Sequence, residues 1–246
     1  SYSYAAQRVF EAGYDVHVPL LPGFGTDPKD LEETCFTQWF AYVANEYERL
    51  RSRYRYLAVV GTSMGGSMTL ALGERYCHTA KAPDALVTIA APVFINSLPD
   101  GVVHDWKLYA ARTVALFTPS IGTAVFTGKE IENDGDELWI GYRGSFVRAG
   151  LSFVHALRRI RRELGRIDCP LLAMHDRNDR TVPYKNLSVI SAQVSSKAAI
   201  TLTTRMQGDH NRHVLLMYRS IQQSLLDTIL TFLASPPDAL QGRHMR

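Results

Sequence analysis

Residues 56–66 read YLAVVGTSMGG, a stretch that joins an apolar run to a glycine-rich turn. The run at 56–60 is continuously apolar, which is typical of a strand buried on both faces of a parallel sheet. Gly61 ends this run, and a helical pattern extends from Met64 to Tyr76. The stretch therefore predicts a strand, a sharp turn that carries Ser63, and a helix.

Ser63 stands at the centre of Gly61-Thr62-Ser63-Met64-Gly65, a G-x-S-x-G motif in the strand-turn-helix context that this motif requires. A serine hydroxyl is a poor nucleophile, so it must be exposed on a turn where a histidine can reach its proton. We predict that Ser63 is a nucleophile. The alternative is a glycine-rich turn with an incidental serine.

The residues around Ser63 fit the geometry of such a turn. Because the turn crowds the positions two residues before and after the serine, glycine is expected there, and Gly61, Gly65 and the adjacent Gly66 agree. The helix that begins at Met64 points its N-terminus at the site. We therefore expect the backbone N–H of Met64 to donate to the oxyanion of a tetrahedral intermediate.

An acid and a base are found later in the chain, in the order serine, aspartate, histidine. The strand-like run at 171–175 leads into an acidic loop, where Asp179 is the candidate that accepts the Nδ1 proton of the histidine. Two histidines, His210 and His213, lie between the last predicted strand and the last predicted helix. We prefer His213, which begins a His-Val-Leu-Leu run into that helix, and His210 remains the alternative.

Strand-like and helical segments alternate along most of the chain. The predicted strands cover residues 14–20, 56–60, 85–90, 171–175 and 198–203. The predicted helices cover residues 4–12, 31–54, 64–76, 184–193 and 217–233. This strict alternation predicts an α/β fold with a mostly parallel sheet and helices on both of its faces.

The alternation is interrupted from residue 94 to residue 165, where helical patterns occur but no convincing strand. We predict a core formed by residues 1–93 and 166–246 and a helical cap insertion at 94–165. An apolar stripe of the cap, which another surface must cover, contains Phe146, Gly150, Phe153, Leu157, Ile160 and Leu164. The opposite side is basic and is expected to be a solvated face rather than a lipid or anion site, with Arg158, Arg159, Arg161 and Arg162.

The composition excludes several classes of protein. The chain has 246 residues, 46% of them hydrophobic, and a formal net charge of +3 without the clustered basic excess of nucleic-acid-binding proteins. No apolar run reaches the roughly 18 residues that a membrane helix needs, and no signal peptide is visible. The three cysteines indicate neither a disulfide framework nor a zinc site. We expect a cytoplasmic protein with no integral membrane segment and no nucleic-acid partner.

These residues resemble the capped α/β-hydrolases, and most closely the small bacterial carboxylesterases and monoacylglycerol lipases. The elbow at 61–66 is similar to that of the family. Residues 175–183 are similar to the family pattern H-G-x-x-D-x-x-V-P, which puts Asp179 in the catalytic place and Asp176 in the place of the glycine. His213-Val214 resembles the catalytic His-Val of the family, although Tyr218 stands where an aspartate is common.

The resemblance also implies what precedes the first helix. In the family, a central strand and a loop that supplies the second oxyanion N–H come before that helix, and this chain begins after them. A vacant central position would leave backbone groups of both neighbouring strands unpaired. We therefore expect roughly 20 or more further N-terminal residues in the natural protein.

The function that the resemblance implies is hydrolysis of carboxylic (acyl) esters by Ser63, Asp179 and His213 through an acyl-enzyme. The expected partner is a small-molecule acyl ester, and no cofactor and no metal are needed. A monoacylglycerol lipase, an acyl thioesterase, a carbon-carbon bond hydrolase and a catalytically inactive binding protein remain alternatives. An epoxide hydrolase or haloalkane dehalogenase is disfavoured, because those relatives carry aspartate at the position of Ser63.

Overall fold

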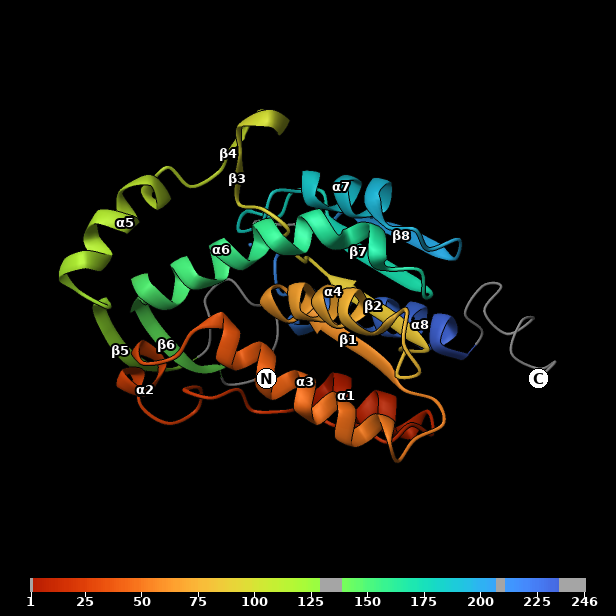
Figure 1. Cartoon of the computed structure of the whole chain (residues 1–246). Helices are drawn as coiled ribbons and strands as arrows, with labels where there is room; N and C mark the ends of the chain where they lie inside the picture. The colour runs from red at the N-terminus through yellow and green to blue at the C-terminus, as the bar shows by residue number, and fades with distance from the viewer. Residues whose placement is uncertain (1, 129–138, 207–210, 235–246) are drawn as a thin grey trace.

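A four-stranded parallel sheet forms the centre of the protein in the computed structural model, which describes residues 2–128, 139–206 and 211–234. The strand order is β1-β2-β7-β8 (Figure 1). The strands are β1 (Ala58–Thr62), β2 (Ala85–Ile89), β7 (Leu171–Asp176) and β8 (Ala199–Thr204). Every residue of β2 and β7 is buried, in agreement with their mainly apolar sequences and central positions.

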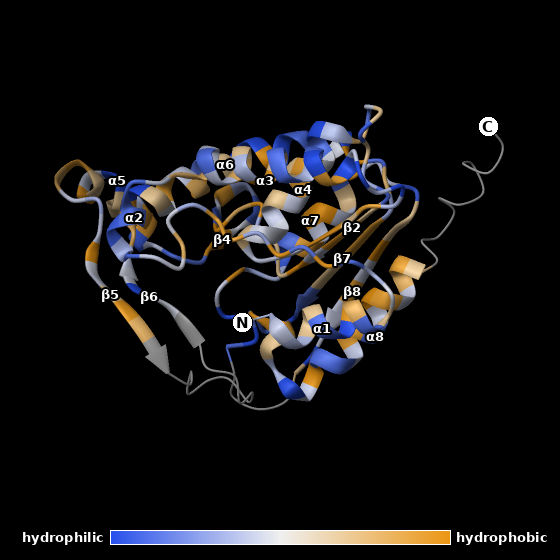
Figure 2. Ribbon diagram, turned by 90° about the horizontal axis from the view of Figure 1, so that it is seen from below, coloured by the Kyte–Doolittle hydropathy of each residue, from blue (hydrophilic) through white to orange (hydrophobic). Residues whose placement is uncertain are grey.

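Helices cover both faces of this sheet, as Figure 2 shows. On one face, Leu86, Leu171 and Ala173 share a hydrophobic cluster with residues of α4 (Met64–Tyr76), α6 (Val147–Glu163) and α7 (Lys185–Gln193). On the other face, Val87 and Leu172 pack with residues of α1 (Ser3–Glu11) and α8 (Arg219–Ala234). Because side chains alternate along a strand, neighbouring residues of β2 enter opposite layers of the core. The predicted α/β architecture is confirmed.

Most predicted boundaries agree with the structure to within a few residues, but the helix expected at 31–54 is two helices. They are α2 (Pro28–Glu32) and α3 (Phe36–Arg51). Cys35 precedes α3 with extended backbone, φ −144° and ψ 167°, and the side chain of Gln38 accepts its N–H at 2.9 Å. This capping interaction stops the helical pattern from continuing backwards through residues 33–35.

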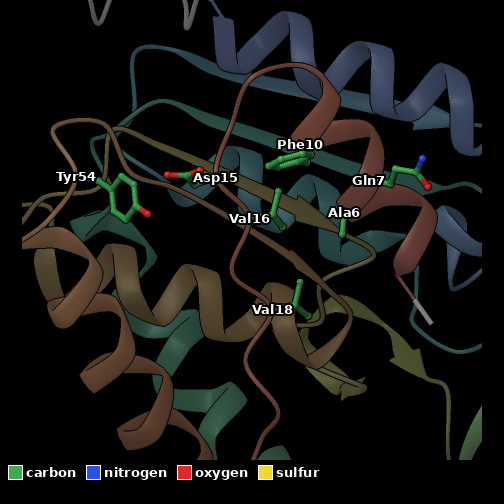
Figure 3. Close-up of a pocket in the computed structure, with 7 residues that line it drawn as sticks. All are labelled: Ala6, Gln7, Phe10, Asp15, Val16, Val18 and Tyr54. Atoms are coloured by element: carbon green, nitrogen blue, oxygen red, sulfur yellow. The ribbon is translucent and has the colours of Figure 1, made fainter.

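The strand expected at residues 14–20 is wrong, since that segment contains no strand. Val16, Val18 and Leu20 are 38%, 63% and 65% exposed. A cavity of about 650 Å³ lies between this segment and α1. Figure 3 shows Val16 and Val18 of the segment and Phe10 of α1 among the side chains that line it. A strand requires a neighbour for its backbone hydrogen bonds, and residues 14–20 lie beside none in the described parts of the chain. The further N-terminal strand stays a prediction.

The segment at 94–165 contains helices, as predicted, but also strands that were not predicted. After the short strands β3 (Asn96–Ser97) and β4 (Val102–Val103), which flank the 3-10 helix η1 (Leu98–Asp100), comes α5 (Lys107–Phe117). Strands β5 (Ile121–Gly128) and β6 (Trp139–Ser145) then pair with each other in antiparallel fashion. Glycines interrupt the alternation of both sequences, which hides the strand signal, while pairing between near neighbours satisfies the backbone.

Helix α6 connects this segment to the core. Its residues Leu157 and Ile160 are buried in the same cluster as the core residue Leu70, so the predicted apolar stripe is covered. On the opposite side, the solvated face predicted for the arginines is wrong for Arg161, which forms an ion pair with Asp100 at 2.6 Å. The other three arginines of that group are exposed. No helix in the part of the chain that the structure describes is long and apolar enough to span a bilayer.

The remaining short elements link larger ones. The 3-10 helix η2 (Leu164–Arg166) follows α6 and leads towards β7. The 3-10 helix η3 (Leu215–Met217) precedes α8 and packs against it. Because all four strands of the main sheet are parallel, their carboxyl ends lie at one edge, and the loops after β1, β7 and β8 meet there.

Candidate active site

Ser63 lies between the end of β1 and the start of α4 in a strained backbone conformation. Its φ of 54° and ψ of −122° are rare for a residue with a side chain. The Ser63 N–H donates to the carbonyl oxygen of Ile89 at 2.8 Å, and the Ser63 carbonyl oxygen accepts the N–H of Ser67 at 3.1 Å. Strain of this kind persists only where the surroundings hold it, and it is concentrated at functional sites.

The crowding predicted around Ser63 exists at two of the three glycines. A Cβ atom at Gly61 would lie 2.2 Å from the carbonyl oxygen of Gly65, and one at Gly66 would lie 2.6 Å from the Cβ of Ala91. The prediction is wrong for Gly65, where a Cβ atom would find no other atom within 4 Å. The strand and the helix approach each other on the side of Gly61 and Gly66, whereas Gly65 faces open space.

His213 reaches Ser63 from the loop that follows β8. Its Nε2 atom lies 2.8 Å from Oγ of Ser63, and its Nδ1 atom lies 2.8 Å from Oδ2 of Asp179. The residue before it, Arg212, has a positive φ of 62°, and Asn211 accepts the N–H of Arg180 at 3.1 Å. These features tie the histidine loop to the loop after β7. The structure thus joins the three predicted side chains in one hydrogen-bonded series.

The Asp179 carboxylate is buried and surrounded by donors. Its Oδ1 atom accepts the backbone N–H groups of Thr181 at 2.7 Å and Val182 at 2.9 Å. Its Oδ2 atom lies 2.8 Å from His213 Nδ1 and 3.2 Å from His175 Nε2. Burial raises the pKa of Asp179, but hydrogen bonds from His175, His213 and Val182 outweigh burial and lower the pKa to about 2. Asp179 is therefore ionised at neutral pH.

The motifs in the sequence do not predict the contact of His175 with Asp179. His175 is 1% exposed, and its Nε2 atom also lies 3.2 Å from the carbonyl oxygen of Val182. A single ring N–H of His175 can be shared between these two acceptors, and it helps to fix the same Oδ2 atom that contacts His213. The one indication of this contact in the sequence is that His175 lies in the strand-like run directly before the acidic loop.

Asp176, the other acidic residue of this loop, has different partners. Its Oδ2 atom accepts the hydroxyl of Thr204 and the backbone N–H of Met206, each at 2.9 Å. Its Oδ1 atom accepts the N–H of Asn178 at 2.9 Å. These bonds connect β7 to the end of β8, and none of them involves the imidazole of His213.

The remaining histidines lie elsewhere. His210, the alternative base, and His244 fall outside the described residues. His17 pairs with Glu46 at 3.0 Å, and His78 pairs with Asp168 at 3.5 Å. His104 and His155 belong to the segment at 94–165, where they contact the carbonyl oxygen of Arg180 and the side chain of Arg112. The site therefore contains one described imidazole that contacts Ser63.

Met64 is the first residue of α4, directly after Ser63. The N–H groups of the first helical turn have no acceptor within the helix, and the helix dipole makes this end positive. Such a group beside an alcohol, an imidazole and a buried carboxylate suits a reaction in which negative charge develops on an oxygen next to the alcohol. Among the described residues, no group of three His, Cys, Asp or Glu side chains is arranged to hold a metal ion.

Sequence comparison identifies one protein family and several related proteins. A family model described as serine aminopeptidase, S33 matches residues 1–214. The thermostable monoacylglycerol lipase of Bacillus sp. (strain H-257) is 31% identical over 193 residues, which cover 78% of this chain and 70% of that protein. The carboxylesterase of Bacillus subtilis (strain 168) is 27% identical over 191 residues, which cover 76% and 69%.

Solved structures show a similar fold. A structure from work on LipS and LipT, two metagenome-derived lipolytic enzymes, has a TM-score of 0.75 and 24% identity, covering 94% of this chain and 86% of its own. The monoacylglycerol lipase of Paleococcus ferrophilus has a TM-score of 0.71 and 16% identity, covering 95% and 88%. Because both structures are less than 25% identical to this chain, they show that it has the same fold.

Proposed function

The chain belongs to the serine aminopeptidase S33 family of α/β-hydrolases, and from this premise we propose that it hydrolyses carboxylic esters with Ser63, His213 and Asp179 as its catalytic triad. One observation carries the proposal. Ser63 Oγ, the His213 ring and the Asp179 carboxylate form a continuous series with two contacts of 2.8 Å. This is the geometry in which an imidazole activates an alcohol for acyl transfer.

The proposed reaction has two steps. Ser63 Oγ attacks the ester carbonyl while His213 Nε2 takes the hydroxyl proton, and the buried Asp179 carboxylate stabilises the imidazolium. The N–H of Met64 donates to the oxyanion, the tetrahedral intermediate collapses, and His213 gives its proton to the departing alcohol. Water then attacks the acyl-enzyme with His213 as base, which releases the acid and restores Ser63.

The substrate that we propose is a small carboxylic ester with an apolar acyl group. The supporting observations are the names of two relatives, a monoacylglycerol lipase and a carboxylesterase, and the apolar side chains of the segment at 94–165 that belong to the same hydrophobic cluster as Met64, the residue after Ser63. The Nε2 atom of His104 lies 3.1 Å from the carbonyl oxygen of Arg180, next to the acid loop. We therefore also propose that residues 94–165 form a cap over the site.

Hydrolysis of a graded series of p-nitrophenyl esters and of a monoacylglycerol tests this function. The wild-type protein should release p-nitrophenol and react with a fluorophosphonate probe, and Ser63→Ala should abolish both. The ratio of kcat/KM between the monoacylglycerol and the simple esters separates a monoacylglycerol lipase from a general carboxylesterase. Equal activity of wild-type protein and Ser63→Ala would overturn the assignment of the nucleophile. If the protein cleaved only substrates with a hydrolysable carbon-carbon bond and no ester, the proposed ester hydrolysis would be wrong and the protein would be a carbon-carbon bond hydrolase.

A further inference from the structure

A second cavity, of about 480 Å³, lies between residues 93–99, α5 and α6. Figure 1 shows α5 and the strands β3 and β4 on the same side of α6. Ser63, Asp179 and His213 do not line this cavity. Its volume falls within the roughly 300–1,000 Å³ that is usual for small-molecule sites.

The walls of this cavity are mainly apolar. They are formed by side chains from all three segments, among them Val93, Leu98, Leu108, Leu151, Val154 and Leu157. Arg161 holds two of the walls together, because its guanidinium pairs with Asp100 at 2.6 Å and lies 5.1 Å from the centre of the Phe94 ring. Helix α5, which forms the third wall, has no buried residue although most of its side chains are apolar. An apolar group in the cavity would therefore cover surface that the protein leaves open.

Positive charge gathers at the same cavity. Arg112 and Arg158 line it together with Arg161, whose charge Asp100 already balances. Arg112 Nη2 lies 3.4 Å from His155 Nε2, a contact that supplies no negative charge. Within the described ranges, neither Arg112 nor Arg158 forms an ion pair with a carboxylate. Two guanidinium groups without counter-ions beside apolar walls fit a ligand with an anionic head and an apolar chain.

We propose that this cavity binds a single-chain amphiphile with an anionic head, such as a free fatty acid. The apolar chain lies against α5 and α6, and the head accepts hydrogen bonds from Arg112 and Arg158. A carboxylate and a phosphate both accept paired hydrogen bonds from guanidinium groups, so the proposal includes ligands with either head group. The site goes beyond the proposed ester hydrolysis, because binding there uses none of the triad residues.

Calorimetric titration with decanoate, decyl phosphate and 1-decanol, each below its micelle-forming concentration, tests this proposal on the full chain. Arg112→Gln/Arg158→Gln should weaken the binding of decanoate by about tenfold and leave 1-decanol unaffected, because only the anionic head needs the guanidinium groups. Arg162→Gln is the matched control, because Arg162 is an exposed arginine of α6 that does not line the cavity. It should change the affinity less than twofold.

A third variant tests the place of the apolar chain. Val154→Phe fills part of the cavity and should weaken decanoate and 1-decanol alike. Arginine-dependent binding of either anion supports the site, and the ratio of their affinities identifies the preferred head. Equal affinity of decanoate for wild type and Arg112→Gln/Arg158→Gln, or no effect of Val154→Phe, would overturn the proposal. Since no hydrolysis is measured, these results are independent of whether Ser63 is a nucleophile.

Discussion

Replacement of Asp179 by asparagine tests the proposed triad, and the local hydrogen bonds fix how the amide would be oriented. The Oδ1 atom of Asp179 accepts two backbone N–H groups, from Thr181 and Val182, so the amide oxygen must take this place. The amide nitrogen then replaces Oδ2, which lies 2.8 Å from His213 Nδ1. Because an NH₂ group donates, Nδ1 must accept, and the ring proton moves to Nε2.

A protonated Nε2 atom cannot take the proton of Ser63, whose Oγ atom lies 2.8 Å away. We expect kcat of Asp179→Asn to fall by about 10⁴-fold, the loss that this replacement causes in a serine protease triad. Initial rates with a p-nitrophenyl ester at neutral pH measure it. Asp168→Asn is a matched control, since Asp168 pairs with His78 at 3.5 Å on the surface, and it should keep full activity. A loss of less than tenfold in Asp179→Asn would refute the tautomer argument.

The same variant should change the response of stability to acid. The pKa of Asp179 is about 2 in the folded protein, below the roughly 3.9 of an aspartate in an unfolded chain. The carboxylate therefore contributes stability that is present above about pH 4 and is lost as the pH falls towards 2, on the order of 2 kcal/mol. Urea unfolding at several pH values should show this loss in the wild type and not in Asp179→Asn. If the free energy of unfolding fell equally with decreasing pH in both proteins, Asp179 would not be the source of the loss.

Three further predictions concern the scaffold. Gly61→Ala should lower the free energy of unfolding by about 3 kcal/mol, because its Cβ atom would lie 2.2 Å from a backbone oxygen. Gly65→Ala, where the Cβ atom meets nothing, should be neutral or stabilising by up to about 1 kcal/mol. Denaturant unfolding of the two variants compares them. Burial raises the pKa of Glu74 to about 8, so stability should fall as the pH rises from about 5 to about 8, and Glu74→Gln should flatten this slope. A thiol reagent should titrate Cys35 in the native protein and all three cysteines after unfolding, because the other two are buried; three reactive native thiols would contradict this.

The sequence predicted those features that depend on local pattern and on the geometry of parallel strands. Continuous apolar runs identify β2 and β7 because strands with two covered faces need apolar side chains throughout. Once such strands are parallel, loops far apart in the chain meet at one edge of the sheet. This is why Ser63, Asp179 and His213 could be selected as neighbours although 150 residues separate the first from the last.

The failures concern features that depend on a partner remote in sequence or on exact backbone direction. Residues 14–20 alternate like a strand, but a strand exists only where another offers its hydrogen bonds. Strands β5 and β6 have a weak pattern and form because each pairs with the other. The open space at Gly65 depends on the direction of one Cα–Cβ bond, which a motif cannot specify.

The strained backbone of Ser63 shows how the scaffold and the site depend on each other. A conformation of this kind costs about 1–3 kcal/mol, and its hydrogen bonds to Ile89 and Ser67 help to offset that cost. The close approach of Gly61 and Gly66 to their neighbours leaves the turn little room to relax. A side chain on Gly61 would push β1 away from α4, and one on Gly66 would push α4 away from Ala91, which follows β2. Either change would move both the hydroxyl of Ser63 and the N–H of Met64. The proposed nucleophile and the proposed oxyanion donor are therefore positioned by the same packing, so damage to that packing should reduce stability and catalysis together.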